Sequence, residues 1–258
     1  AIFSVVAWSW VGCVLIGMLP YLFSGVFPCS RIDNALFETI SGFSTTGSTV
    51  LQDIEANSKG ILFWRQLTQW YGGMGIIVLA VTVLPSLGVG GLQLMTAESP
   101  GHESDKLRAR SIDTAKSLWL VYFGVTITIA LLLWATPNVG LYDAVAHGLS
   151  TAAIGGFSTK NGSIGSFDSY IVELIIVFGM FVGAMNYNLQ YKFWKSKGNF
   201  RVFTRSSEWK LYVRITLSFI GVIFLMNWLM ESVDVGTAFR DSLFNVVTLA
   251  SSTGFGNV

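Results

Sequence analysis

Charged side chains are scarce in this chain of 258 residues, and their scarcity argues against an ordinary soluble protein. They make up 12% of the residues, whereas soluble domains carry about 25%. Residues 1–30 contain no charged side chain, and neither do residues 66–97. A formal net charge of +1 gives no basis for binding nucleic acid or another polyanion. Hydrophobic residues instead make up 52% of the chain, which favours a protein that lies in the lipid bilayer.

Residues that carry out enzyme chemistry are also few. The chain has two histidines and two cysteines, and it shows neither a metal-ligand spacing nor a nucleophile elbow. We therefore expect no enzyme, no catalytic residue and no covalent cofactor. Cys13 and Cys29 leave a disulfide open, but two inert buried thiols are the favoured interpretation. No signal-peptide pattern is visible and the first residue is not methionine, so we expect the natural start to lie elsewhere.

Five stretches are apolar enough to cross a bilayer, which takes about 20 residues at roughly 1.5 Å each. These stretches are 7–23, 67–87, 117–135, 170–191 and 215–230. A short segment with helical spacing follows the first, third and fifth of them, and Asp33 or Asn34 can cap the first short helix. We therefore predict an all-α membrane protein of repeated span, short pore helix with loop, and span. The predicted repeats are 1–95, 96–195 and an incomplete third, 196–258, that ends at its loop.

The three short segments share one register, and each ends in a glycine-centred loop. The glycines are Gly47, Gly156 and Gly254. Thirteen positions before each glycine stands Asn or Asp, twelve before it a small residue, and six before it a hydroxyl residue. In chain order these are Asn34, Asp143 and Asp241; Ala35, Ala144 and Ser242; and Ser41, Ser150 and Thr248. Internal repeats of this kind are common in transport proteins and place the substrate path on the axis that relates them.

A half-length helix ending in such a loop has the architecture of an ion-selectivity filter. A helix of about 12 residues is roughly 18 Å long and reaches only the middle of the membrane. Its C-terminal end presents the negative end of the helix dipole to a cation, and loop carbonyls replace the ion's hydration shell. Glycine accepts the positive φ that such a loop needs. The predicted filter residues are Thr45, Thr46, Gly47, Ser48, Ile154, Gly155, Gly156, Phe157, Ser252, Thr253, Gly254 and Phe255.

The distribution of lysine and arginine predicts the orientation. The connections after the second and fourth spans hold 11 of the 16 basic residues. They are Lys106, Arg108, Arg110, Lys116, Lys192, Lys195, Lys197, Arg201, Arg205, Lys210 and Arg214. Loops rich in Lys and Arg stay in the cytoplasm. We therefore expect these connections inside the cell and the glycine loops on the outer face.

Several motifs carry a resemblance to a known family. Ser252-Thr-Gly-Phe-Gly256 looks like the potassium-channel filter Thr-Val-Gly-Tyr-Gly. The chain as a whole resembles the Trk/Ktr/HKT superfamily of potassium transporters, in which one polypeptide carries four non-identical versions of the span, pore helix and span unit. The segments Phe63–Ile77 and Arg110–Trp119 look like its TrkH branch, and Gly155-Gly-Phe-Ser-Thr159 is similar to its second filter.

The resemblance implies a pore-forming part of a potassium uptake system in a bacterial inner membrane, with K⁺ as the transported ion. Glycine at the key filter position is typical of potassium-selective members, whereas some sodium-selective members have serine in the first filter; Gly47 thus favours potassium. The family likeness also implies a homodimer and a cytoplasmic nucleotide-binding regulatory subunit. A fourth filter, a closing third-repeat span with its gating loop, and two N-terminal spans of the TrkH branch have no counterpart here. We therefore expect an internal portion of a longer protein.

Several polar residues and glycines within the apolar segments have two open interpretations each. Glu38, His147 and Asn245 share one pore-helix position nine residues before the glycine, and we favour hydrogen-bonded structural roles over ion binding. Arg65 is interpreted as a pairing or snorkelling residue. Asn186 and Asn188 face the inner pore or join helices. Five further glycines are interpreted as helix-packing positions; they are Gly72, Gly73, Gly75, Gly179 and Gly183.

Two other functions stay open. The glycine loops could be re-entrant hairpins of a solute carrier or other membrane protein. The same fold could also conduct Na⁺ or cations without selection. Replacing a filter glycine by serine separates these hypotheses, because only a selective filter loses its K⁺ preference.

Overall fold

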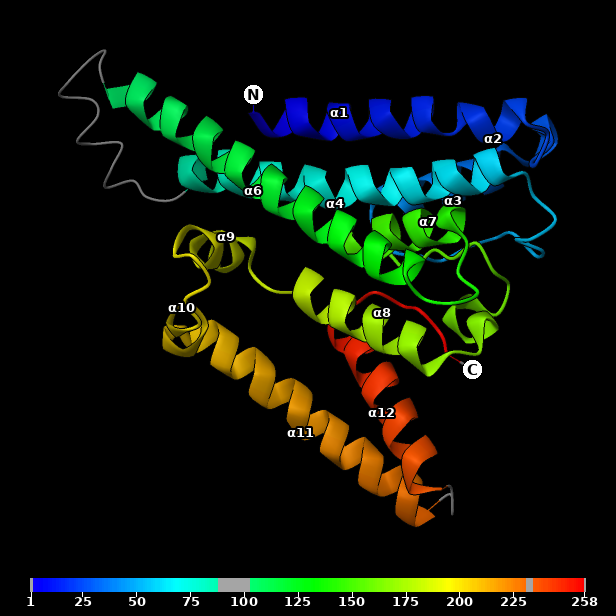
Figure 1. The fold of residues 1–258 in the computed structure, drawn as a ribbon. Helices are drawn as coiled ribbons and strands as arrows, with labels where there is room; N and C mark the ends of the chain where they lie inside the picture. Colours follow the sequence, from blue (N-terminus) through cyan, green and yellow to red (C-terminus); the bar gives the residue numbers. More distant parts are fainter. Residues whose placement is uncertain (1, 88–102, 231–233, 258) are drawn as a thin grey trace.

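The computed structural model describes residues 2–87, 103–230 and 234–257, and this part of the chain is built of helices joined by loops, with no strand (Figure 1). The predicted all-α class is confirmed. The helices are α1 (Ile2–Gly17), α2 (Leu19–Phe23), α3 (Ile32–Phe43), α4 (Lys59–Leu87), α6 (Glu103–Trp134), α7 (Leu141–Ala152), α8 (Tyr170–Gly183), α9 (Tyr187–Lys195), α10 (Arg201–Arg205), α11 (Ser207–Met230) and α12 (Val235–Ala250), with 3₁₀ turns at Cys29–Arg31 and Ser163–Phe167.

In the part of the chain that the structure describes, three segments have the length and hydropathy to cross a membrane: Val6–Phe23, Ala115–Trp134 and Ser207–Met230. They coincide with the first, third and fifth predicted spans. The first is made of α1 and α2, and Pro20 stands in the first turn of α2, where a missing amide costs no hydrogen bond. The second predicted span lies within α4, although its side chains from residue 76 onward fall outside the described part.

The fourth predicted span, 170–191, is wrong as a single helix. α8 ends at Gly183, α9 starts at Tyr187, and the two are bent by 96°. Asn186 starts the new helix because its side chain accepts a hydrogen bond from the Asn188 amide at 2.9 Å. The Gln190 side chain donates to the freed carbonyls of Val182 and Met185 at 2.8 and 3.3 Å. The break is therefore stabilised by its own polar residues.

The three short helices are present where the register predicts them. α3 and α7 have 12 residues each, and α12 has 16 because it begins earlier, at Val235. Asp234 caps α12 by accepting the Gly236 amide at 2.9 Å. The predicted cap of the first short helix is wrong: α3 continues from a 3₁₀ turn, so Asp33 falls inside its first turn and no side chain caps it.

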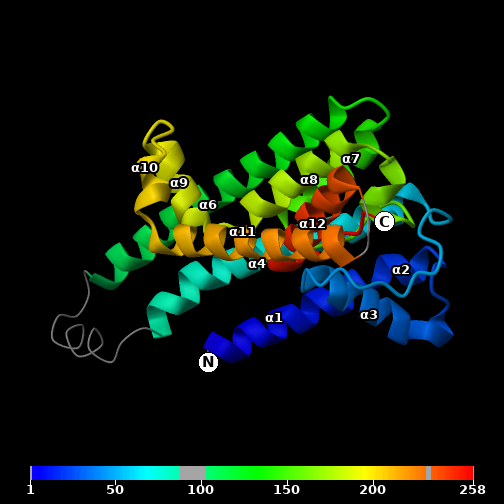
Figure 2. The same cartoon turned by 90° about the horizontal axis from the view of Figure 1, so that it is seen from below.

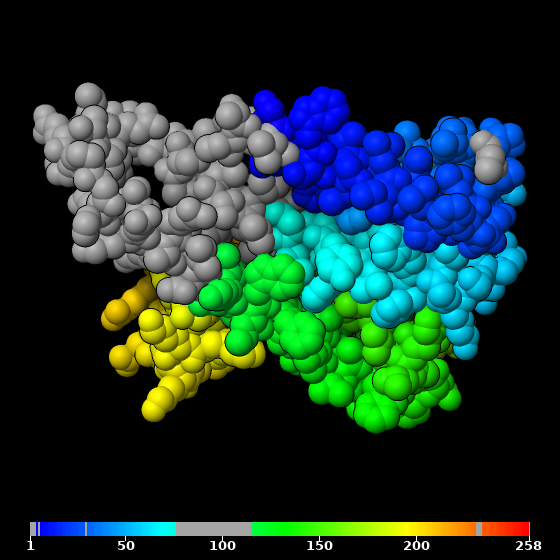
Figure 3. Space-filling model, turned by 90° about the horizontal axis from the view of Figure 1, so that it is seen from above, coloured from blue at the N-terminus to red at the C-terminus, as the bar shows by residue number. Residues whose placement is uncertain are grey.

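The short helices pack inside a frame of longer ones. α3 contacts α4, α7 lies against α4, α6 and α8, and α12 packs on α8 and α11. Seen from above, the surface of the N-terminal helices lies beside that of α4, and α6 follows it (Figure 3). Figure 1 shows α12 between α8 and α11, and the view from below shows the same neighbours (Figure 2). The main buried cluster joins α6, α7, α8 and α12, so one core runs across the boundary between the second and third predicted repeats.

Glycines allow two of these close approaches. A Cβ on Gly72 would overlap the Phe43 main chain, and one on Gly179 would stand 2.6 Å from the Thr151 side chain. Each contact joins a long helix to the end of a short one, so the packing interpretation holds for both glycines. The predicted repeat boundary at 95 and 96 lies outside the described residues, and the boundary at 195 and 196 coincides with the end of α9.

Candidate functional site

Three loops with one backbone shape follow the short helices α3, α7 and α12. We name them the first loop (residues 45–49), the second loop (154–158) and the third loop (252–256). In each, two residues at alternate positions have positive φ. The values are 54° and 78° at Thr45 and Gly47, 50° and 80° at Ile154 and Gly156, and 58° and 84° at Ser252 and Gly254. The glycines meet the sequence expectation, but the left-handed residue two positions earlier was not predicted.

The loops also leave their helices through the same hydrogen bond. The amide of the residue before each glycine donates to the carbonyl of the hydroxyl residue five positions earlier, at 2.9 Å in all three cases. The pairs are Thr46 to Ser41, Gly155 to Ser150, and Thr253 to Thr248. The predicted filter residues therefore lie in three equivalent loops at the carboxyl ends of three helices.

Neighbouring loops touch through their glycines. A Cβ on Gly47 would overlap the carbonyl oxygen of Gly155, and a Cβ on Gly156 would overlap the carbonyl oxygen of Thr253. Beside Gly254, no atom of the described residues comes within 4 Å of a built Cβ. The first loop thus lies against the second and the second against the third. This order brings the candidate residues of all three repeats into one continuous assembly of main-chain oxygens.

The hydroxyl position supports the first and third loops in the same way. Ser41 donates to the carbonyl of Ser48 at 2.5 Å, and Thr248 donates to that of Phe255 at 3.1 Å. Ser150, at the same position of the second repeat, donates instead to Gln69 Oε1 at 2.6 Å. The second loop is therefore supported by a side chain of the first repeat.

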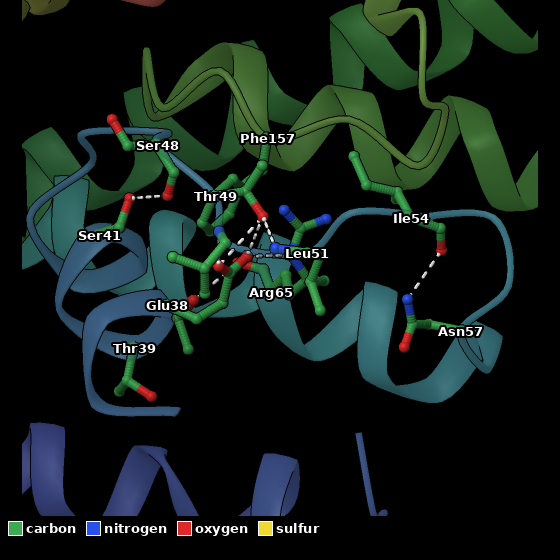
Figure 4. A network of polar contacts seen from close by, with 12 residues as sticks. Glu38, Thr39, Ser41, Ser48, Thr49, Leu51, Ile54, Asn57, Arg65 and Phe157 are labelled. Atoms are coloured by element: carbon green, nitrogen blue, oxygen red, sulfur yellow. Dashed lines mark hydrogen bonds and ion pairs between the residues drawn. The ribbon is translucent and has the colours of Figure 1, made fainter. Parts of the chain in front are cut away.

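Glu38 and Arg65 form a buried ion pair behind the first loop (Figure 4). Both side chains are 0% exposed, and Arg65 Nε donates to Glu38 Oε1 at 2.8 Å. The carboxylate also accepts from the Thr49 hydroxyl at 2.8 Å and from the Val50 amide at 3.0 Å. The Glu38 carboxylate is fully engaged in protein contacts, which supports its structural interpretation.

Arg65 also reaches the second loop. Its Nη1 donates to the Ser158 carbonyl at 3.2 Å, and the guanidinium lies 4.1 Å from the centroid of the Phe157 ring. Arg65 and Glu38 therefore connect the last residues of the first and second loops. The pairing interpretation of Arg65 is confirmed.

His147 occupies the Glu38 position in the second repeat and performs a similar task. Its Nδ1 lies 2.8 Å from the Asp143 carbonyl and its Nε2 2.8 Å from the Ser158 hydroxyl. A carbonyl only accepts, so the Nδ1 proton points to Asp143 and Nε2 of the neutral ring accepts from Ser158. Asn245, the third member, is exposed. Glu38 and His147 thus each bind the residue two positions after the glycine of their own loop, Thr49 and Ser158.

The first residue of the register closes the second and third loops. Asp143 accepts from the Thr159 hydroxyl at 2.6 Å, and Asp241 accepts from the Asn257 amide at 3.1 Å. Both bonds join the residue thirteen before the glycine to the residue three after it. The hydrogen bond to the end of the loop therefore gives a structural reason for aspartate at this position of the second and third short helices.

Asn161 connects the segments that follow the first and second loops. It accepts from the Ile54 amide at 2.7 Å, donates to Asp53 Oδ1 at 2.9 Å, and its own amide donates to Glu55 at 3.2 Å. The Asn161 hydrogen bond lowers the pKa of Asp53 below its ordinary value. Asp53 therefore stays ionised and keeps this bond through the neutral range.

A second ion pair connects the second and third repeats. Arg240 donates twice to the Glu173 carboxylate, at 2.6 and 2.7 Å. The Glu173 side chain is buried and that of Arg240 is one-third exposed. Sequence analysis missed this pair, because nothing in the spacing of two residues 67 positions apart indicates contact. Asn186, in contrast, donates to Glu208 at 3.1 Å, which fits its helix-joining interpretation.

The chemistry available at the loops is that of oxygen ligands. Among residues 2–87, 103–230 and 234–257, no three His, Cys, Asp or Glu side chains come together as a metal site. The loops offer main-chain carbonyls and the hydroxyls of Thr45, Thr46 and Ser252 instead. Neutral oxygen ligands suit hard cations of low charge rather than transition metals.

Comparison with known proteins gives concordant results. The family model for TrkH, described as cation transport protein, matches residues 2–258. The chain is 40% identical over 255 residues to the Trk system potassium uptake protein TrkH of Salmonella typhimurium, covering 98% of this chain and 52% of that protein. It is 31% identical to the Trk system potassium uptake protein TrkI of Halomonas elongata, covering 96% and 49%.

A solved structure matches the fold as well. The crystal structure of the potassium transporter TrkH from Vibrio parahaemolyticus superposes with a TM-score of 0.85 at 35% sequence identity, covering 98% of this chain and 51% of that one. The chain thus spans about half the length of the relatives that it matches.

Proposed function

Because the chain belongs to the TrkH family of cation transport proteins, we propose that it forms pore-lining repeats of a potassium ion uptake system. K⁺ is the transported substrate in this proposal. The relatives bear the name of potassium uptake proteins of a Trk system, and the fold is that of a potassium transporter. The chain acts as a transporter subunit and not as an enzyme.

The observation that carries the proposal is the contact between successive glycine loops. Three loops of the same left-handed shape follow three short helices, and the glycines of the first two pack on a carbonyl of the next loop. Backbone carbonyls held in this way can replace the hydration shell of a K⁺ ion, and the ends of three helix dipoles favour a cation. The filter consists of the twelve residues that the sequence predicts, four in each repeat.

The repeats 1–95, 96–195 and 196–258 are proposed as the units of the pore. Each of the first two has a helix before its short helix and loop and another after it, α1 and α4 in the first and α6 and α8 in the second. The basic connections favour a cytoplasmic location for the ends opposite the loops. We place the protein in a bacterial inner membrane, with the loops facing outside. A homodimer with a cytoplasmic nucleotide-binding regulatory subunit fits the naming of its relatives as parts of a system.

Uptake of K⁺ and Na⁺ by the full-length protein with Gly254→Ser tests the proposal. This residue has open space around it but a φ of 84°, so serine adds conformational strain of about 1–2 kcal/mol without a clash among the described residues. Gly60→Ser is the matched control, since its surroundings are also open and its φ is helical. We expect Gly254→Ser to have a lower K⁺ over Na⁺ preference than the wild type. Gly60→Ser should keep the wild-type preference.

The alternatives give different results. A non-selective or Na⁺ pathway of the same fold shows no K⁺ preference before substitution. A solute carrier with re-entrant loops shows no cation flux that depends on Gly254. Unchanged K⁺ selectivity in Gly47→Ser, Gly156→Ser and Gly254→Ser together would remove the filter proposal.

A further inference from the structure

We propose that Gln69 is a positioning residue that sets the ion preference of the second loop from the neighbouring repeat. This inference rests on the proposed function, since it concerns the selectivity of the same loops. Gln69 lies on α4, in the first repeat, and its side chain is fully buried. It lies beside the chain at Gly155 and Phe157, the residues on both sides of the second glycine.

The Gln69 amide uses both of its ends on the second loop and its helix. Nε2 donates to the Gly155 carbonyl at 2.5 Å. Oε1 accepts from the Phe157 amide at 3.2 Å and from the Ser150 hydroxyl at 2.6 Å. The partners fix the orientation of the amide, because a carbonyl cannot donate and a main-chain N–H cannot accept. One side chain therefore holds the main chain on both sides of Gly156, at the Gly155 carbonyl and the Phe157 amide, and also the Ser150 hydroxyl.

Within the described part of the chain, neither the first nor the third loop has such a support directly beside its glycine; in the third loop the Ser163 hydroxyl reaches only Gly256, two positions after the glycine. In the first and third loops the hydroxyl residue bonds directly to the carbonyl one position after the glycine, within its own repeat. Among the described residues, Gln69 alone brings a side chain from another repeat into hydrogen bonding with the main chain immediately beside a filter glycine. The second loop is therefore chemically different although its backbone shape is the same.

The absence of a side chain at Gly155 belongs to this arrangement. A Cβ on Gly155 would overlap the carboxamide of Gln69, whereas the corresponding residues of the other loops are Thr46 and Thr253. Glycine at this position thus has a packing reason separate from its conformational freedom, because the Gly155 φ is not positive. The pair of Gln69 and Gly155 explains the Gly-Gly sequence of the second loop.

The held carbonyl also lies against the first loop. Gly155 O occupies the space where a Cβ of Gly47 would stand, so a shift of this peptide moves the contact between two loops. Ion preference in a filter depends on the number and direction of its carbonyls. We infer that Gln69 adjusts selectivity in both loops by fixing one peptide.

The test measures reversal potentials or uptake ratios for K⁺ and Na⁺ in the full-length protein. Gln69→Met keeps the size and removes the hydrogen bonds, and we expect a fall of about threefold to tenfold in the K⁺ over Na⁺ ratio, as for loss of one or more net hydrogen bonds. Gln66→Met is the matched control: Gln66 is on the same helix, fully buried, and has no hydrogen-bond partner among the described residues. This control is expected to keep the wild-type ratio.

Ser150→Ala extends the test if Gln69→Met fails to reach the membrane. It removes one donor to Oε1 and leaves the bond to Gly155, so we expect a smaller fall in the ratio than for Gln69→Met. In the double variant the Ser150 change adds nothing, because Ser150 acts through Gln69. A selectivity ratio is the chosen readout because a purely structural role changes the amount of protein and not the ratio.

Two results overturn the inference. One is a wild-type ratio in both Gln69→Met and Ser150→Ala; the other is an equal fall in Gln66→Met. If Gly156→Ser changes the ratio in the same assay while the Gln69 variants do not, the inference fails and the proposed filter stands. If the glycine variant also leaves the ratio unchanged, the proposed function fails first.

Discussion

The buried pair of Glu38 and Arg65 predicts a large loss of stability when one partner is removed. Arg65→Met leaves the Glu38 carboxylate without its cation in a site that is 0% exposed. Removing one member of a buried pair typically costs about 3–5 kcal/mol, and the lost contact with the Phe157 ring adds roughly 0.5–2 kcal/mol. We therefore expect about 4–6 kcal/mol, which lowers the folded to unfolded ratio by roughly a factor of 10³ to 10⁴.

The assay is a double-mutant cycle on detergent-solubilised protein, unfolded by denaturant. Glu38→Gln alone leaves the Arg65 guanidinium unpaired, whereas Glu38→Gln with Arg65→Met removes both charges. The double variant should therefore lose at least about 2 kcal/mol less than the sum of the single variants. The control is Arg31→Ala, because Arg31 and Asp33 form a pair 3.9 Å apart with side chains 61% and 73% exposed. Such a pair contributes about 0–1 kcal/mol.

An additive cycle would refute the reasoning. If the double variant loses the sum of the single losses within about 0.5 kcal/mol, the two charges do not stabilise one another. An equal loss in Arg31→Ala would show that burial has no part in the effect.

Three further predictions concern other contacts between segments far apart in the sequence. Arg240→Met leaves the buried Glu173 carboxylate unpaired; thermal unfolding should occur at a lower temperature, and unchanged melting would show that the pair contributes nothing. Gly72→Ala forces a methyl group into the main chain of α3, so membrane-inserted protein should fall in quantitative blots, while normal amounts would contradict the close approach. The bond from Asn161 to Asp53 joins the segments that follow the first and second loops. It stabilises them at pH values above the lowered folded pKa of Asp53 and is lost as the pH falls through that pKa. Proteolysis of these segments should therefore increase in acid for the wild type, whereas Asn161→Ala should be cleaved equally fast at all pH values.

The sequence predicted the three short helices because each carries its own local signal. Apolar residues at helical spacing, an Asn or Asp thirteen residues before a glycine, and that glycine itself recur three times. Each occurrence therefore strengthens the prediction of the other two. The left-handed glycines followed from the same register. The residues two positions earlier, Thr45, Ile154 and Ser252, have no chemical feature in common, and their positive φ is imposed by the loop. A β-branched side chain such as that of Ile154 gives no signal for this conformation.

The bend after α8 was missed for a different reason. Hydropathy counts apolar residues and treats 170–191 as continuous, while the break depends on the caps formed by Asn186 and Gln190. Both were visible as polar residues within the stretch. The capping Asn could have been found by asking where the first amide N–H groups of a new helix bond, and Gln190 by asking where the freed carbonyls bond.

The supports of the loops come from tertiary contacts that no local pattern contains. Gln69 lies 86 residues from Gly155 in the chain, and Arg65 lies 93 residues from Ser158. The sequence indicated only that Arg65 begins an apolar stretch and needs a partner. Which loop each side chain supports depends on how the repeats pack together.

The most direct test of the account is the position of the ion. Diffraction data from the full-length protein crystallised with Rb⁺, collected at the rubidium absorption edge, would locate a potassium substitute by its anomalous signal. The account predicts peaks bounded by main-chain oxygens of all three loops, next to Gly47, Gly156 and Gly254. Peaks elsewhere in the membrane region, with none between these loops, would contradict it.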